Sequence, residues 1–125
     1  MLMKLQTLCL ALAVIVLVGC KTTTGFAPGS RGYDPVPDGE KAEAAFSGGD
    51  GLSIKRAVVI TEATGEKAGV RAEYVWLHEQ YPGYRLQVQR LRNEEKKVYD
   101  EMDIVTADGK SHTIFFDITS FFGKF

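Results

Sequence analysis

Residues 97–119, KVYDEMDIVTADGKSHTIFFDIT, decide the fold because they contain two strand patterns on either side of one turn. Apolar residues recur at even spacing in both halves, at Val98, Met102 and Ile104 and then at Ile114, Phe116 and Ile118. This alternation is typical of strands with one buried face. The Asp-Gly pair between them is a strong turn signal, so the segment is predicted to form a β-hairpin.

The apolar pattern also selects the register of this hairpin. A two-residue Asp-Gly turn would place Asp103 beside Ile114, a charged residue beside an apolar one. A three-residue loop with its glycine in the left-handed conformation places Met102 opposite Ile114 and Ile104 opposite His112. The second register keeps apolar residues together, and we predict it.

The residues before the hairpin predict one helix and two further strands. A helix is expected from about Glu66 to Gln80, where Val70, Tyr74 and Leu77 form an apolar stripe at helical spacing. It should end at Tyr81-Pro82-Gly83, because a proline disfavours helical backbone in the residue before it. Residues 84–88 alternate as a strand with one wet face, and residues 52–62 predict the first strand. Residues 40–46 are expected to form one or two helical turns.

Together these elements predict an α+β domain over residues 51–125. One helix packs on a four-stranded antiparallel sheet, in the order strand, helix, strand, strand, strand. About 70 residues are enough for such a domain to fold alone, with little margin.

Residues 1–19 have the pattern of a bacterial lipoprotein signal peptide. Lys4 supplies the positive charge, and the apolar run that follows it is too short to cross a bilayer. The run closes with Leu17-Val18-Gly19-Cys20, a lipobox, which predicts cleavage before Cys20 and a diacylglycerol on its thiol. Residues 20–50 begin with this lipidated cysteine and continue as a Gly- and Pro-rich flexible tether.

The lipid predicts a place in the bacterial cell envelope. Because Lys21 rather than an aspartate follows Cys20, we expect the outer membrane, facing the periplasm, in a host with two membranes. The other cysteine, Cys9, lies in the signal peptide, so no disulfide is expected in the mature domain. The 15 Lys and Arg nearly balance the 16 Asp and Glu, which argues against a nucleic-acid partner. The expected partners are the membrane, through Cys20, and another envelope protein.

The chain resembles an uncharacterised family of small bacterial proteins, many of them lipoproteins, that end in a segment close to YFDISSFFGKF. The resemblance covers about residues 52–125. It rests on Ala72-Glu73-Tyr74-Val75-Trp76-Leu77, Tyr81-Pro82-Gly83, Tyr99-Asp100, Thr106-Ala107-Asp108-Gly109 and Phe116-Asp117-Ile118-Thr119-Ser120-Phe121-Phe122-Gly123-Lys124-Phe125. Phe116 and Thr119 stand where the family often has tyrosine and serine. The resemblance implies no catalytic residues.

No pattern in the sequence predicts a catalytic residue, a metal or a cofactor. His78 and Glu79 are adjacent on the predicted helix and point about 100° apart, which is poor for a shared ligand. His112 is expected in solvent near the hairpin tip, and two histidines without cysteines lack the spacing of a zinc site. Asp100 is in phase with the buried residues and is expected to hydrogen-bond the C-terminal turn. The glycine cluster at residues 47–51 predicts a turn, because no Lys-Ser or Lys-Thr pair follows it as in a phosphate loop.

Aromatic residues gather at the C-terminus, with five phenylalanines in residues 115–125. One interpretation is a lid over the hydrophobic core, with Phe116 inside. The other is a surface that docks a partner, since aromatic residues are enriched at interface centres. The residues of this expected docking surface are Tyr99, Val105, Phe115, Phe121 and Phe122.

Two classes of function follow from these observations. The preferred one is a non-enzymatic, lipid-anchored envelope protein that acts as a protein-binding, assembly or inhibitor module. The alternative is a small-ligand-binding module with a cystatin-like or nuclear-transport-factor-like cleft between helix and sheet, and a hydrolase is less favoured. A flat aromatic sheet face would support the first, and a concave site with converging polar groups would support the second.

Overall fold

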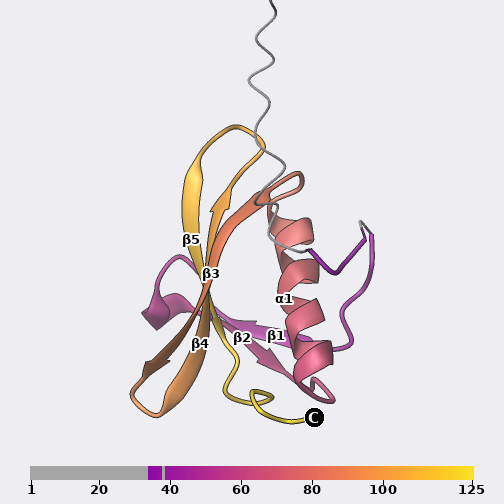
Figure 1. Ribbon diagram of the computed structural model, residues 1–125, viewed down its shortest axis with the longest axis vertical. Coiled ribbons are helices and arrows are strands. Elements are labelled where there is room, and N and C mark those ends of the chain that lie inside the picture. Colours follow the sequence, from indigo (N-terminus) through magenta and orange to yellow (C-terminus); the bar gives the residue numbers. More distant parts are fainter. Residues whose placement is uncertain (1–33, 38) are drawn as a thin grey trace, which may run out of the picture.

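A mixed five-stranded sheet and one long helix form the computed structural model, which describes residues 34–37 and 39–125. The helix α1 lies against one face of the sheet (Figure 1). The strand order is β1-β2-β5-β4-β3. The elements are β1 (Ala45–Gly48), the short 3-10 helix η1 (Ile54–Arg56), β2 (Val58–Thr61), α1 (Glu66–Gln80), β3 (Arg85–Glu94), β4 (Lys97–Val105) and β5 (Ser111–Asp117). The predicted α+β class with one helix is therefore confirmed.

The hairpin of β4 and β5 has the predicted register. Met102 pairs with Ile114, and Ile104 pairs with His112. Gly109 in the connecting loop has φ +84°, the left-handed conformation that a three-residue loop requires. Met102, Ile104 and Ile114 are almost completely buried, so the apolar pairing that selected this register does form the core.

The helix α1 has the predicted bounds, Glu66–Gln80, and ends before Tyr81. Its buried face is wider than a single stripe, because the sheet covers one side and the segment before β1 covers another. Leu77 is completely buried, and Trp76 packs edge-on against Phe116 with ring centroids 5.4 Å apart. Gly69, which weakens the helix in isolation, is where the ring of Phe121 packs against the helix backbone.

The sheet differs from the prediction of four antiparallel strands. A fifth strand, β1, pairs with β2 in antiparallel fashion, so the helical turns expected at residues 40–46 are wrong. In addition, β2 runs parallel to β5, through the pairs Val58 with Phe116 and Val59 with Asp117. Four residues of β1 carry too little alternation to predict a strand, and the parallel pairing is set by contacts between distant parts of the chain.

The strand predicted at residues 52–62 is shorter than expected. Only Val58–Thr61 forms a strand, and Ile54–Arg56 is a 3-10 turn. Asp50 causes this loop, because its carboxylate accepts hydrogen bonds from the backbone of Leu52 and from the guanidinium of Arg56. The apolar residues at the start of the predicted strand consequently leave its buried face, and Leu52 is 43% exposed.

Some residues that were assigned to the tether belong to the folded domain. The strand β1 is one such part, and Val36, which is only 5% exposed, belongs to the core. An ion pair between Glu40 and Arg71 holds this segment to α1, and so does a contact between Asp34 and His78, whose Oδ2 and Nε2 atoms are 2.8 Å apart. The ordered domain therefore begins before residue 51, while the signal peptide, Cys20 and residues 21–33 lie outside the described residues.

The core lies between α1 and the inner face of the sheet. Its largest completely buried apolar side chains are Phe116, Phe121, Ile60, Leu77, Met102, Ile104, Ile114, Val58 and Val75. Among the described residues, no helix has the length and apolar character needed to span a membrane.

Candidate functional site

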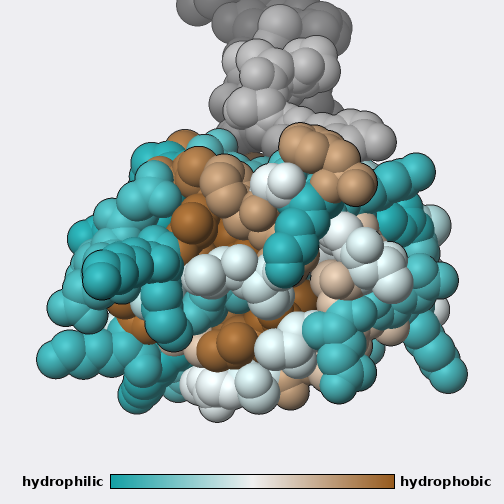
Figure 2. Space-filling model, turned by 90° about the horizontal axis from the view of Figure 1, so that it is seen from below, coloured by the Kyte–Doolittle hydropathy of each residue, from teal (hydrophilic) through white to brown (hydrophobic). Residues whose placement is uncertain are grey.

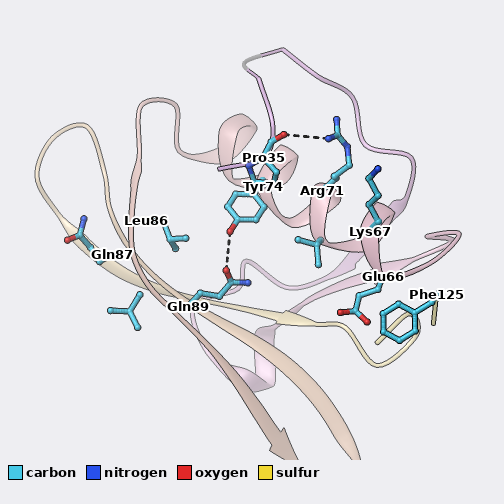
Figure 3. A pocket seen from close by; sticks show the side chains of 11 residues that line it. Pro35, Glu66, Lys67, Arg71, Tyr74, Leu86, Gln87, Gln89 and Phe125 are labelled. Atoms are coloured by element: carbon cyan, nitrogen blue, oxygen red, sulfur yellow. Dashed lines mark hydrogen bonds between the residues drawn. The ribbon is translucent and has the colours of Figure 1, made fainter. Parts of the chain in front are cut away.

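A cleft of about 650 Å³ separates α1 from the edge strand β3. Figure 3 shows its walls, with helix side chains on one side, β3 on the other and Phe125 at one end. Its apolar lining includes Val70 of the helix together with Leu86 and Val88 of β3. Viewed from the end of the molecule, apolar surface gathers in the middle of the face with hydrophilic side chains around it (Figure 2). The volume lies within the range of small-molecule sites in proteins.

The position of β3 at the end of the sheet leaves the cleft open. In the described sheet β3 pairs only with β4, and most of its residues are exposed. The register of this pairing shifts between Leu86 and Val88, which makes Gln87 a bulge. A bulge bends an edge strand and re-aims its side chains, and both Gln87 and Val88 line the cleft.

Polar groups converge at the back of the cleft. The hydroxyl of Tyr74 on α1 donates a hydrogen bond of 3.0 Å to Oε1 of Gln89 on β3. The Nε2 of Gln89 in turn donates to Oδ2 of Asp100 on β4. Behind them lies the carboxyl group of Glu73, which is completely buried in the helix–sheet interface. These four residues tie the helix to both strands of the β3–β4 hairpin.

Burial changes the ionisation of the two acids. Loss of solvent, together with the charge and hydrogen bonding of Asp100, raises the pKa of Glu73 well above its usual value. Loss of solvent also raises the pKa of Asp100, although hydrogen bonds from Gln89 and Glu73 oppose this effect. Burial therefore favours the protonated form of Glu73.

The rim of the cleft carries a few charged groups, most of them paired. Arg71 forms an ion pair with Glu40 and donates a 3.5 Å hydrogen bond to the carbonyl oxygen of Pro35. Glu66 accepts a 3.1 Å hydrogen bond from the backbone of Gly123. With Lys67 beside them on the helix, these groups frame the apolar lining with roughly balanced charge.

The five residues of the expected docking surface do not form one surface. Tyr99 is buried beside η1, and Phe121 is completely buried under the helix at Gly69. Val105 and Phe115 are half-buried, and Phe122 is 41% exposed on the C-terminal turn. The position of Phe121 therefore fits the interpretation of the C-terminal aromatic residues as a lid over the core.

The outer face of the sheet is charged where an aromatic surface was expected. Arg90 on β3 contacts Glu101 at 3.0 Å and Asp103 at 2.6 Å, both on β4. Asp103 also accepts a 2.6 Å hydrogen bond from Thr113 on β5. These cross-strand pairs leave Phe115 beside acidic and basic neighbours.

The histidines and Asp100 occupy ordinary structural positions. His78 pairs with Asp34, and His112 packs against Tyr81 with ring centroids 5.6 Å apart. Asp100 is buried, as predicted from its alternation with Met102 and Ile104. The expected hydrogen bond to the C-terminal turn is wrong, because Asp100 interacts with Gln89 and Glu73. In the part of the chain that the structure describes, no three His, Cys, Asp or Glu side chains come together to hold a metal ion.

Glu73 and Gln89 were missed as members of the site. The signal for Glu73 was available, because it lies four residues after Gly69 and four before Leu77, on the buried face of the helix. Gln89 gave no such signal, because its role depends on the bulge that sets which β3 residues face the helix.

No known protein family, curated protein or solved structure matches this chain.

Proposed function

We propose that this protein is a lipid-anchored, non-enzymatic binding protein of the bacterial envelope that holds its partner in the cleft between α1 and β3. The observation that carries the proposal is the cleft itself, about 650 Å³ with apolar walls and a few polar groups at its back. The acids at its back, Glu73 and Asp100, are buried behind its wall, and Glu66 on its rim is bonded to the backbone of Gly123. This placement supports binding over hydrolysis, because a general acid or base must reach the substrate.

A segment of another envelope protein is the favoured partner. The open edge of β3 lies along the cleft, so an extended segment could pair with β3 through main-chain hydrogen bonds. Its alternate side chains would then enter the cleft between Val70 and Leu86. Strand addition of this kind uses surfaces that the fold already provides, and the protein would act as an assembly or inhibitor module.

A small amphiphilic ligand is the second candidate. It is favoured by the volume of the cleft, about 650 Å³, and by the convergence of Tyr74 and Gln89 at its back, which would orient a polar group. The shape of the sheet also favours this candidate. Its outer face is charged and not a flat aromatic surface, and polar groups converge in the concave cleft on the inner side.

Site-specific photocrosslinking in the envelope distinguishes these candidates. A photoreactive residue in place of Val88, which lines the cleft and is 44% exposed, should capture the partner. The matched control is Leu52, which is 43% exposed but outside the cleft residues, and it should capture none. A protein adduct supports strand addition, and a small mass increase of the chain itself supports the second candidate. Equal capture from both positions would contradict the proposed site.

The lipid anchor is tested separately at Cys20. Because the thiol is the group that accepts the diacylglycerol, Cys20→Ser should abolish acylation and leave the protein uncleaved or unanchored. Radiolabelled palmitate and membrane fractionation measure the two effects. Normal palmitate incorporation in this variant would contradict the lipoprotein assignment, and fractionation on a density gradient tests the proposed outer-membrane location.

A further inference from the structure

Two buried carboxyl groups, those of Glu73 and Asp100, interact in the helix–sheet interface, and no cation among the described residues acts on Glu73. Glu73 projects from α1 and is 0% exposed, and Asp100 projects from β4 and is 6% exposed. Among the described residues, the only charge that acts on Glu73 is that of Asp100. Two buried carboxylates in contact repel each other strongly, so such a pair is stable only when it retains a proton.

The hydrogen bonds of the two acids differ, and the difference favours a proton on Glu73. No donor among the described residues reaches either carboxyl oxygen of Glu73. Asp100, by contrast, accepts a hydrogen bond from the amide of Gln89 and one from the backbone of Glu101. A protonated Glu73 can donate to Asp100, which gives Glu73 a partner and leaves Asp100 an acceptor. The orientation of the Gln89 amide, with its oxygen toward Tyr74, agrees with this arrangement.

We propose that Glu73 and Asp100 share one proton and form a proton-dependent latch that holds α1 against the β3–β4 hairpin and thereby sets the width of the cleft. The latch reaches the cleft through Gln89, which bonds to Asp100 and lines the cleft wall together with Tyr74. Loss of the proton places two negative charges in the helix–sheet interface. The repulsion is relieved when α1 and β3 move apart, so the cleft loosens as pH rises.

Around the pair, the part of the chain that the structure describes supplies no second group that would produce the same response. From the helix the neighbouring group is the phenol of Tyr74, and from β3 it is the neutral amide of Gln89. From β5 and the C-terminal turn, the buried apolar side chains are Ile114, Phe116, Ile118 and Phe121, while the buried acid of β5, Asp117, alternates to the other face of the sheet and pairs with Lys97. The described Lys and Arg side chains that form ion pairs are bonded to other acids, such as Lys97 to Asp117 and Arg90 to Asp103.

The direction of the pH effect follows from linkage. The pKa of Glu73 is higher in the folded chain than the usual value of 4.5, so the folded state binds the extra proton above that pH. Stability contributed by the protonated pair is complete at about pH 4.5 and is lost as pH rises toward the folded pKa. In that window the folding equilibrium constant should fall about tenfold per pH unit, which corresponds to about 1.4 kcal/mol.

Unfolding of the protein purified from the envelope in detergent tests the latch between pH 5 and pH 8. Trp76, the single tryptophan, packs against Phe116 and reports the unfolding of the domain. Glu73→Gln mimics the protonated acid, so its stability should equal that of the wild type near pH 5 and exceed it increasingly at higher pH. Glu79→Gln is the matched control, because Glu79 is an exposed glutamate of the same helix, and it should follow the wild type.

Two further measurements keep the proposal falsifiable. Asp100→Asn removes the other negative charge of the pair, so it should also reduce the pH dependence of stability. This variant tests the proposal if Glu73→Gln fails to fold. Amide hydrogen exchange in β3 around Gln87–Gln89, corrected for its intrinsic pH dependence, should be several-fold faster at pH 8 in the wild type than in Glu73→Gln. Parallel stability curves for wild type and Glu73→Gln would overturn the shared proton. Equal β3 exchange in the two proteins at pH 8 would overturn the link to the cleft.

Discussion

At Gly69 the helix lacks a side chain because the ring of Phe121 occupies the space that a Cβ atom would fill. An added Cβ would lie within 3.0 Å of several ring atoms, closer than real Cβ contacts allow. Gly69→Ala should therefore destabilise the domain by about 1–3 kcal/mol through overpacking, although alanine gains about 1 kcal/mol of helix propensity. Chemical denaturation measures the change.

The double variant Gly69→Ala with Phe121→Leu separates the two effects. A smaller residue at position 121 relieves the clash, so the two changes should be less than additive because the residues are in contact. A single Gly69→Ala variant that is more stable than the wild type would show that the ring of Phe121 can move away at little cost.

Several residue roles could be predicted from the sequence because they depend on local spacing. The burial of Ile114 and Phe116 follows from alternation, and the end of α1 at Gln80 follows from the proline two residues later. The contact between Gly69 and Phe121 could not be predicted, because it joins residues that are distant in sequence. For the same reason the pairing of Glu73 with Asp100 was missed, although each residue lies on the buried phase of its own element.

The strand β5 places Phe115 and Phe116 on opposite faces of the sheet, which predicts unequal costs for their removal. Phe116 is completely buried, so Phe116→Ala should cost about 3–5 kcal/mol. Phe115 is half-buried on the charged outer face, so Phe115→Ala should cost clearly less. Thermal unfolding compares the two variants. Equal losses would mean that η1 and its loop bury the outer face as tightly as the helix buries the inner one.

Among the elements, α1 and the β4–β5 hairpin were predicted, whereas in the N-terminal part of the sheet β2 was predicted as part of a longer strand and β1 was missed. The hairpin has a long alternating pattern and a turn that fixes its register, so local signals agree. By contrast, β1 has four residues and η1 interrupts an apolar run that alternates like a strand. The loop at Asp50 decides this region through side-chain hydrogen bonds to Leu52 and Arg56, which hydrophobic periodicity does not encode.

For the whole molecule, stability should be highest at mildly acidic pH, because buried acids respond in opposite directions. Burial opposes the ionisation of Asp117, but hydrogen bonds from Lys97 and Thr119 outweigh it and lower the pKa of Asp117. The stability that ionised Asp117 contributes is present above the pKa of this group in the unfolded chain, 3.8, and is lost as the pH falls below that value. Glu73 has the opposite effect above about pH 4.5.

Unfolding midpoints measured from pH 2.5 to pH 5 test the acid side of this prediction. Asp117→Asn should be less stable than the wild type at pH 5 and should lose less stability on acidification, because the variant has no carboxylate to protonate at this position. Lys97→Met tests the same pair from the other side and should shift the acid transition to higher pH. An acid transition unchanged in both variants would assign it to another acid, such as Asp103 on the outer face, whose pKa is lowered by its hydrogen bond from Thr113.

The parallel seam between β2 and β5 has a consequence for how the chain reaches its native state. Two residue pairs form this seam, and Val58 and Phe116 are separated by almost half of the chain. The β3–β4–β5 meander closes short loops, whereas the seam must close a long one, and distant pairings form slowly. We therefore expect the meander and α1 to assemble first and β1–β2 to dock last. Until that step the side of β5 that later pairs with β2 is an unprotected strand edge, so a newly synthesised chain is most prone to aggregate before β2 arrives.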